Sequence, residues 1–258
     1  MTTKSQCLHS LCLLLMMSGL SAAVNGQEAP PDRQGPTTSS QHPSVVMVLG
    51  YNKKTGAHQQ ATGFFLNQAG DVVTNYHVIA GIRDIKIWTT ANQGFPVTKI
   101  INTDLPADLA ILAVDIPSNS VQPASIAGQM PVADETIQVI GHPLGHQQRR
   151  SQGLISSLFP TAKVGPLLQF TAPIAAGSSG SPLLNDSGQV VGIASFILYL
   201  DTDKEPRYFA IPSTRLILLQ KTSGPDLYSS RHTEDLVKTP RLRETIPSGQ
   251  APETPADK

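Results

Sequence analysis

The chain has 258 residues with 19 basic and 19 acidic side chains, so its formal net charge is zero and gives no electrostatic reason to expect nucleic acid as a partner. Hydrophobic residues make up 40% of the chain, which is enough to fill a core and excludes a wholly disordered protein. The 20 glycines and 21 prolines indicate a globular protein with many turns.

The first 26 residues have the order of a secretory signal peptide. Lys4 precedes an apolar run at residues 11–15, and small residues follow. The run is too short to span a bilayer comfortably, so we expect export to the periplasm or the extracellular space, with no stable membrane insertion after cleavage. Retention as an anchor is the alternative. Both cysteines, Cys7 and Cys12, fall inside this segment, which leaves the mature chain without a thiol.

Residues 27–43 are rich in proline, glutamine, serine and threonine, and they predict a disordered linker. Beyond them, short β-like runs alternate with turn residues, and the helical stretches that a parallel α/β sheet needs are missing. The pattern predicts an all-β fold of antiparallel barrels or a sandwich. The runs are SVVMVLGY, ATGFFLN, DVVTNYHV, IKIWTT, LAILAVD, TIQVIGH, GLISSLF, LLQFTA, SPLLN, QVVGIASFIL and YFAIP.

Residues 117–131 interrupt this pattern and divide the core into two halves of similar size. The last β-like run is followed by a helix candidate from Ser213 to Lys221, with Ser213 available as its N-cap. The segment 222–258 is proline-rich with mixed charge, and it predicts a disordered tail.

The sequence GSSGSPL at residues 177–183 is the first chemical signal. Glycine on both sides of a serine permits backbone angles and close approaches that a β-carbon forbids, so the serine can stand at a sharp turn beside convergent N–H groups. An ordinary Gly/Ser turn between strands is the alternative. If Ser178, Ser179 or Ser181 is a nucleophile, it needs a histidine as base and a carboxylate behind the histidine.

Among the seven histidines, His77 stands out because it ends the apolar run DVVTNYHV. The alternative for His77 is a buried histidine that is hydrogen-bonded by backbone. His142 and His146 have a spacing that suits two metal ligands on a helix, but Pro143 and Gly145 between them disfavour a helix. We therefore expect no metal site and no cofactor.

Asp108 is the candidate carboxylate, because it lies in the run PADLAILAVD at the start of an apolar strand, where an unpaired charge would be costly to bury. Asp104 and Asp115 flank the same run at its loop ends, where we expect solvent. The chain order is then His77, Asp108 and a serine of GSSGSPL. Double-β-barrel serine proteases use this order, whereas subtilisins and α/β-hydrolases use others.

These segments resemble the trypsin-like serine proteases of the HtrA (Deg) type. TGFFLNQAGDVVTNYHVIAG is similar to the family's histidine segment, ADLAILAVD to its aspartate segment, and AAGSSGSPLLNDSGQVVGIAS to its nucleophile segment. VIGHPLGHQQRRSQGLISS and YFAIPS also match. The resemblance implies a protease domain at residues 44–221, built from two six-stranded antiparallel β-barrels, at about 44–118 and 131–212, and a short C-terminal helix.

The same resemblance implies the roles of the site residues. Ser179 would be the nucleophile, His77 the general base and acid, and Asp108 its orienting partner. The N–H groups of Gly177 and Ser179 would form the oxyanion hole.

Two positions of the nucleophile segment depart from the family pattern. Ser178 and Ser181 stand where the family has asparagine and glycine; both are small, and we expect the turn to survive. Ser178 also cannot pair with a newly cleaved N-terminus, so we expect no zymogen switch of that kind. The family's PDZ domains have no counterpart after residue 221, so we expect no PDZ-gated activation.

The same resemblance implies a specificity pocket. Pro173, six residues before Ser179, would occupy the pocket base where trypsin has an acid, which disfavours cleavage after lysine or arginine. We expect an apolar pocket that prefers small or medium aliphatic residues. Its other residues would be Ile174, Ala175, Ile193, Ala194, Ser195 and Phe196.

The main hypothesis is an exported serine endopeptidase that hydrolyses peptide bonds of unfolded or damaged proteins through an acyl-enzyme. A catalytically silent peptide-binding module on the same fold is one alternative, and a protease that stays latent until it assembles is another. Relatives often form trimers through their N-terminal segments, but residues 27–43 lack aromatic anchors, so both a monomer and a trimer remain open.

Overall fold

The computed structural model describes residues 41–51, 56, 58–82, 84–145, 147–162, 165–199 and 205–222. The expected signal peptide at residues 1–26, most of the expected linker, and the expected tail beyond Thr222 lie outside the described residues. Within the described ranges, no helix is long and apolar enough to cross a membrane.

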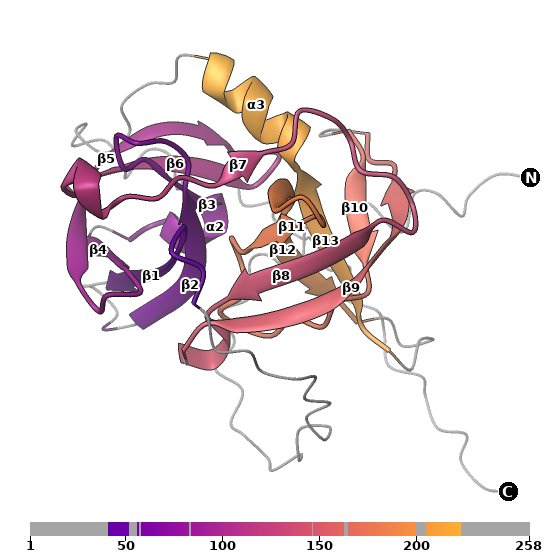
Figure 1. Cartoon of the computed structure of the whole chain (residues 1–258), viewed down its shortest axis with the longest axis horizontal. Coiled ribbons are helices and arrows are strands. Elements are labelled where there is room, and N and C mark those ends of the chain that lie inside the picture. The colour runs from indigo at the N-terminus through magenta and orange to yellow at the C-terminus, as the bar shows by residue number, and fades with distance from the viewer. Residues whose placement is uncertain are drawn as a thin grey trace, which may run out of the picture. The chain divides into compact units, whose positions relative to one another are not determined.

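The first barrel is a closed antiparallel sheet in the order β1-β2-β3-β6-β5-β4 (Figure 1). It closes because β1 pairs with both β2 and β4. Its interior is filled by aliphatic and aromatic side chains, among them Val48, Phe65 and Leu112. The strands are β1 (Val45–Tyr51), β2 (His58–Phe65), β3 (Val72–Asn75), β4 (Asp84–Trp88), β5 (Gly94–Asp104) and β6 (Leu109–Val114).

The strand β5 was not among the predicted runs. Its register against β6 shifts twice, between Val97 and Lys99 and again between Ile100 and Asn102. Each shift breaks the alternation of buried and exposed residues that a regular strand shows. Because of these two bulges, the 11-residue sequence of β5 lacks the alternation of apolar and polar residues that predicts a strand.

The second barrel is also antiparallel, in the order β11-β8-β9-β10-β13-β12, and a pairing of β11 with β12 closes it. The predicted fold class of two closed six-stranded barrels is therefore confirmed. The stretch 117–131 holds an additional strand, β7 (Ser125–Ile126), which runs parallel to β12. The barrel strands are β8 (Thr136–Gly141), β9 (Arg149–Phe159), β10 (Leu167–Phe170), β11 (Pro182–Leu184), β12 (Gln189–Leu198) and β13 (Arg207–Pro212).

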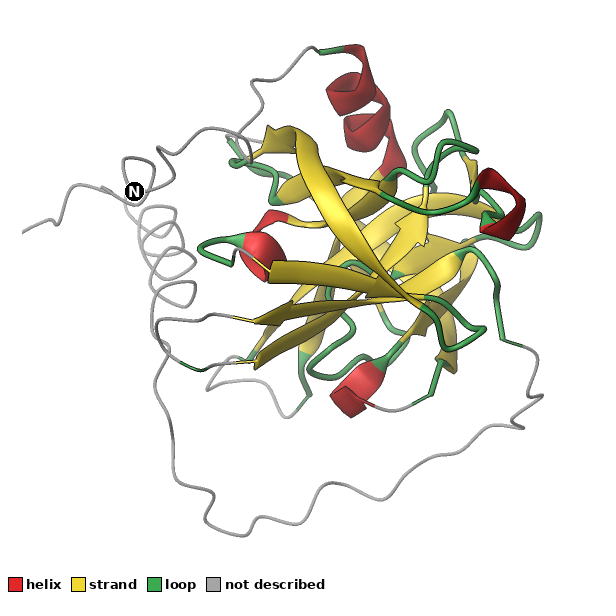
Figure 2. Cartoon of the chain, turned by 90° about the vertical axis from the view of Figure 1, so that its left-hand side faces the viewer, coloured by secondary structure: helices red, strands yellow, loops and turns green. Residues whose placement is uncertain are grey.

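A shared core joins the two barrels. Phe64 and Leu109 of the first barrel pack in one buried cluster with Ile140 and Ile193 of the second and with Leu216 of the C-terminal helix. Figure 2 shows how strands dominate both barrels, with the helical turns at their margins. Because this cluster spans both barrels, it fixes the loops that meet at their junction relative to one another.

The predicted helix is present as α3 (Ser213–Lys221). Its expected cap is wrong: Pro212 occupies the N-cap position, and no side chain caps the helix. The Ser213 hydroxyl instead donates to the Ala127 carbonyl at 2.9 Å. The serine therefore serves a tertiary contact that no local pattern indicates.

The end of the expected linker belongs to the folded domain. The amide of His42 donates to Oε1 of Gln148 at 2.6 Å, and Nε2 of Gln148 donates to the carbonyls of His42 at 3.0 Å and Val45 at 2.9 Å. One side-chain amide therefore holds residues 42–45 against the chain just before β9, so residues 41–43 are not a free linker.

Candidate active site

His77 lies in a short helix and not at the end of a strand as expected. The strand β3 ends at Asn75, and the chain turns into α2 (Tyr76–Ile79). The segment that precedes β6 fixes this turn, because the carbonyl of Asp108 accepts hydrogen bonds from Nδ2 of Asn75 at 3.0 Å and from the amide of Tyr76 at 3.1 Å. The backbone thus brings His77 beside Asp108.

Asp108 lies directly before β6, as predicted, with a left-handed φ of 57° and only 8% of its surface exposed. Its carboxylate has three partners: the His77 amide on Oδ1 at 2.8 Å, the His77 Nδ1 on Oδ2 at 2.7 Å, and the Ser195 hydroxyl on Oδ2 at 2.8 Å. An ionised carboxylate only accepts hydrogen bonds, so it selects the tautomer with the proton on Nδ1. The other ring nitrogen, Nε2, is then free to accept a proton.

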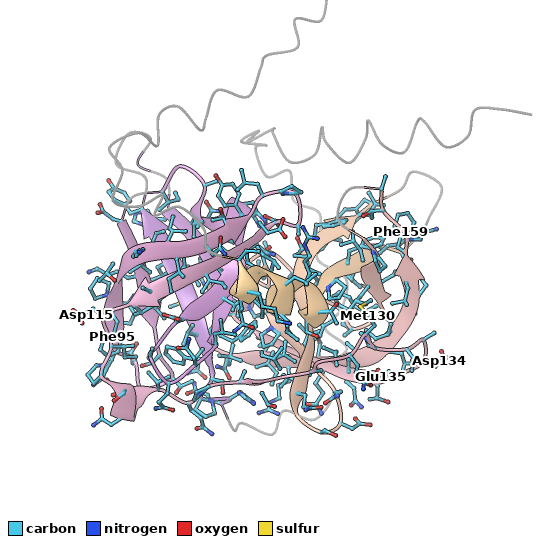
Figure 3. The ribbon with its side chains drawn as sticks, turned by 90° about the horizontal axis from the view of Figure 1, so that it is seen from above. Phe95, Asp115, Met130, Asp134, Glu135 and Phe159 are labelled. Atoms are coloured by element: carbon cyan, nitrogen blue, oxygen red, sulfur yellow. The ribbon has the colours of Figure 1, made fainter. Side chains whose placement is uncertain are left out.

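The two flanking carboxylates lie elsewhere. Asp115 is exposed, and Figure 3 shows it at the end of the first barrel that faces away from the second. Asp104 is not solvated as expected: its side chain is 11% exposed and pairs with Nε of Arg215 at 2.5 Å. The hydrogen bond that Arg215 donates to Asp104 raises the pKa of the Arg215 guanidinium. Asp108 is therefore the carboxylate that reaches His77.

The serine turn, residues 177–181, has the backbone that its glycines predict. Gly177 and Gly180 have φ of 92° and 84°, where other residues are strained. Ser178 tightens the turn, because its amide donates to the Ala175 carbonyl at 2.9 Å and its hydroxyl accepts from the Ala175 amide at 3.3 Å. A β-carbon on Gly180 would lie 2.0 Å from the carbonyl oxygen of Thr62, so only glycine fits there.

Ser179 is partly exposed, and its hydroxyl donates to the Ser195 carbonyl at 3.3 Å. Within the described ranges it has no hydrogen bond to the ring of His77; such contacts are often long in ligand-free enzymes and shorten when substrate binds. The amides of Gly177 and Ser179 donate to no acceptor among the described residues. Two N–H donors without an acceptor among the described residues thus lie on the turn that carries this serine.

Ser195 has a contact that the sequence did not reveal. It was predicted as a wall of a pocket, but its hydroxyl is buried and bonded to Asp108, 87 residues away in the chain. Its carbonyl accepts the Ser179 hydroxyl. Ser195 therefore contacts Ser179 through its backbone carbonyl and Asp108 through its side-chain hydroxyl.

Two other residues of the predicted pocket are closed to a ligand. Ile193 and Ala194 are fully buried, Ile193 in the cluster between the barrels and Ala194 in the core of the second barrel. The strand β12 is covered on both faces, so neither alternating set of side chains is free. Their assignment to a substrate pocket is therefore corrected, because only their backbone can lie beside a substrate.

The rest of the predicted pocket is accessible. Pro173 is exposed, and Ile174, Ala175 and Phe196 are partly exposed. Phe196 stacks on Phe209 of β13 with ring centroids 4.9 Å apart. No charged side chain occurs in this set, so any ligand that it contacts meets apolar surface.

His142 is one half of the histidine pair considered as a metal site, and His146 lies outside the described residues. His142 is 9% exposed, and Nδ1 of its ring has no hydrogen-bond partner within the described part of the chain. In that same part, no group of three or more His, Cys, Asp or Glu side chains could hold a metal ion. Burial lowers the pKa of His142 to about 4.

The low pKa of His142 predicts a loss of stability in acid. The unfolded chain takes up this proton near pH 6.5 and the folded protein near pH 4, so the stability present above pH 6.5 falls as the pH drops toward 4. When the pH falls from 7.5 to 4.5, we expect the protonation of His142 to lower the free energy of unfolding by roughly 2 to 3 kcal/mol. Urea unfolding at both pH values should show a smaller difference for His142→Gln than for the wild type. The exposed His58 provides the control, and His58→Gln should retain the wild-type difference.

Comparison with known proteins gives a family. The model of the trypsin-like peptidase domain matches residues 61–193. Among curated relatives, the chloroplastic Protease Do-like 1 of Arabidopsis thaliana is 33% identical over 144 residues, which are 53% of this chain and 33% of the relative. The Serine protease Do-like HtrA of Lactobacillus helveticus is 32% identical over 59% of this chain and 39% of the relative.

A probable periplasmic serine endoprotease DegP-like of Pseudomonas fluorescens is 31% identical over 62% of this chain and 34% of its own length. The chain thus spans little more than a third of the length of these curated relatives.

Solved structures agree on the fold. A serine endoprotease from Yersinia pestis is 28% identical with a TM-score of 0.58, and the match covers 69% of this chain and 61% of the Yersinia chain. A protease from M. tuberculosis in its active form has a TM-score of 0.61 and 23% identity, and covers 70% of this chain and 81% of that chain. The family model spans His77, Asp108 and Ser179, and the chain belongs to the family of trypsin-like peptidase domains.

Proposed function

We propose that this protein is a serine endopeptidase that cleaves unfolded or damaged polypeptides through an acyl-enzyme. Ser179 acts as nucleophile, His77 as general base and acid, and Asp108 as the group that orients His77. The observation that carries the proposal is the hydrogen bond between Oδ2 of Asp108 and Nδ1 of His77, together with the partly exposed Ser179 that is bonded to the Ser195 carbonyl and carries two unpaired amides at its turn.

The chemistry follows from these groups. Oγ of Ser179 attacks the substrate carbonyl carbon while Nε2 of His77 takes the hydroxyl proton. The carbonyl oxygen becomes an oxyanion, which the free amides of Gly177 and Ser179 stabilise. His77 then gives its proton to the leaving amine and the C–N bond breaks. Water, deprotonated by His77, hydrolyses the acyl ester in the same way and regenerates Ser179.

The substrate proposal rests on the accessible pocket residues. Pro173, Ile174, Ala175 and Phe196 offer apolar surface and no acidic group to pair with lysine or arginine. We therefore assign a preference for small or medium aliphatic residues before the cleaved bond. Export to the periplasm is part of the same proposal, supported by the N-terminal sequence and by relatives that are named as periplasmic.

A silent or latent peptide-binding module is the second candidate. It is favoured by one contact, the bond of the Ser179 hydroxyl to the Ser195 carbonyl, because this hydroxyl is not bonded to His77. A fluorophosphonate probe separates the two candidates, since only an activated serine reacts with it. Labelling of Ser179 in the resting protein supports the enzyme, and its absence supports the silent or latent module.

Digestion of casein tests the activity and the specificity together. Residues 27–258 should degrade casein, which lacks a stable fold, faster than a compact protein of similar size. Mass spectrometry of the new C-termini should show mainly alanine, valine, isoleucine and leucine. Cleavage mainly after arginine or lysine would contradict the proposed pocket, and intact casein would contradict the proposed activity.

A further inference from the structure

Thr62 of β2 is fully buried, and it has one hydrogen bond within the first barrel and three to residues of the second half of the domain. Its hydroxyl donates to the Gly177 carbonyl at 2.8 Å and accepts from the His142 amide at 2.9 Å. Its amide donates to the Ser179 carbonyl at 2.9 Å, and its own carbonyl accepts the Thr74 hydroxyl at 2.8 Å. Every polar atom of this residue is therefore used.

These contacts fix the backbone that carries the two free amides. In a trans peptide the C=O and N–H groups point in opposite directions. The Ala176 carbonyl is held by the Leu144 amide at 2.8 Å, which turns the N–H of Gly177 the other way. The Gly177 carbonyl on the other side is held by Thr62. The glycine is thus bonded on both sides.

The hydrogen bond from the Thr62 hydroxyl restricts backbone rotation at Gly177 more than it would at a residue with a side chain. Gly177 has no side chain, its φ is 92°, and glycine rotates more freely than any other residue. The opposite contact depends on backbone alone: Leu144 has a left-handed φ of 54° and a side chain that is 67% exposed. Thr62 therefore supplies the side-chain bond that limits rotation of Gly177.

We propose that Thr62, a residue of the first barrel, is the positioning residue of the oxyanion hole in the second. This inference rests on the proposed function. Without the hydroxyl, the Gly177 carbonyl loses its partner, so the peptide group after Gly177 can rotate about this glycine and the N–H groups of Gly177 and Ser179 no longer keep a fixed relative orientation. Because the hole stabilises charge that develops only in the transition state, the loss falls on kcat and not on KM.

The test compares Thr62→Val with Thr62→Ser. Valine keeps the branched shape and removes the hydroxyl, whereas serine keeps the hydroxyl. Removal of a direct oxyanion donor lowers kcat by about 100- to 1000-fold, and loss of a group that only positions the donor should cost less. We expect Thr62→Val to lower kcat about 10- to 100-fold with KM unchanged, and Thr62→Ser to remain within about threefold of the wild type.

Transition-state binding provides a second readout. A peptide boronate places an oxygen in the hole, so its affinity for Thr62→Val should fall by the same factor as kcat. Ser213→Ala is the matched control, because it also removes a buried hydroxyl that donates to a carbonyl, that of Ala127 at 2.9 Å. It should lower the melting temperature and leave kcat and boronate affinity unchanged.

The outcomes separate this inference from the proposed function. An inactive wild type overturns both. An active wild type with Thr62→Val within twofold of its kcat, or with Thr62→Ser as impaired as Thr62→Val, overturns the role of Thr62 alone. If Thr62→Val does not fold, Thr62→Ala removes the same hydroxyl without placing a methyl group against the Gly177 carbonyl, and it has the same expected result.

Discussion

Ser179→Ala is expected to lose about six orders of magnitude in turnover, because the groups that activate the nucleophile act as a unit and the remaining two have nothing to activate. The measurement is kcat on a chromogenic peptide with an aliphatic residue before the scissile bond. The variant should fold normally, since among the described residues the lost hydroxyl has a single hydrogen bond, of 3.3 Å to the Ser195 carbonyl. We expect its free energy of unfolding to change by less than about 1 kcal/mol.

The same motif provides the control. Ser181 lies two residues further along, and its hydroxyl is fully buried with no hydrogen-bond partner among the described residues. Ser181→Ala should keep wild-type turnover, because it removes a polar group that no described residue satisfies and leaves the backbone bonds of the turn in place. Equal loss in both variants would mean that the turn, and not the Ser179 hydroxyl, is what matters.

The sequence predicts the three central residues because each carries a local signal. Asp108 is a charged residue directly before the buried strand β6. Ser179 is followed by Gly180, a position where any side chain would clash with the Thr62 carbonyl. His77 follows a fully buried strand, and only its exact local structure differs, since it lies in α2. The local pattern predicts that His77 is the candidate base. The helix α2 in which it lies depends on a distant contact, because the Asp108 carbonyl accepts from the Asn75 side-chain amide and the Tyr76 backbone amide.

The two contacts that the sequence did not predict, that of Ser195 with Asp108 and that of Thr62 with Gly177, have no such signal. Ser195 and Thr62 are ordinary polar residues within strands, and both act through contacts far along the chain, Ser195 with Asp108 over 87 residues and Thr62 with Gly177 over 115. Such contacts depend on how the two barrels pack. A single sequence shows the propensity of each strand but not which residue of the other barrel faces it.

The errors about Ile193 and Ala194 have a related cause. A run such as QVVGIASFIL predicts a strand whether one face or both faces are covered. The sequence therefore predicts β12 correctly and misjudges which side chains a substrate can reach. Burial on both faces follows from the shared core between the barrels, to which Ile193 contributes.

Asp108→Asn is expected to lower kcat about 10⁴-fold at neutral pH while the protein stays folded. The carboxylate now accepts from Nδ1 of His77 at 2.7 Å and from the Ser195 hydroxyl at 2.8 Å, both on Oδ2. An amide nitrogen at that position donates instead of accepting, so Nδ1 must become the acceptor and the ring proton moves to Nε2. A ring protonated on Nε2 cannot take the proton of Ser179.

Asp104→Asn is the matched control, since Asp104 lies in the same segment of the chain and pairs with Arg215 instead of a histidine. It should leave kcat unchanged and lower the free energy of unfolding by roughly 1.5 to 3 kcal/mol, because a charge-assisted hydrogen bond to Arg215 is weakened. Fluorophosphonate labelling should slow in parallel with turnover for Asp108→Asn and stay at the wild-type rate for Asp104→Asn. If Asp108→Asn retains more than about a hundredth of the turnover, another group sets the tautomer of His77. The hydrogen bond from the His77 backbone amide to the side chain at position 108 is then the contact that orients the ring.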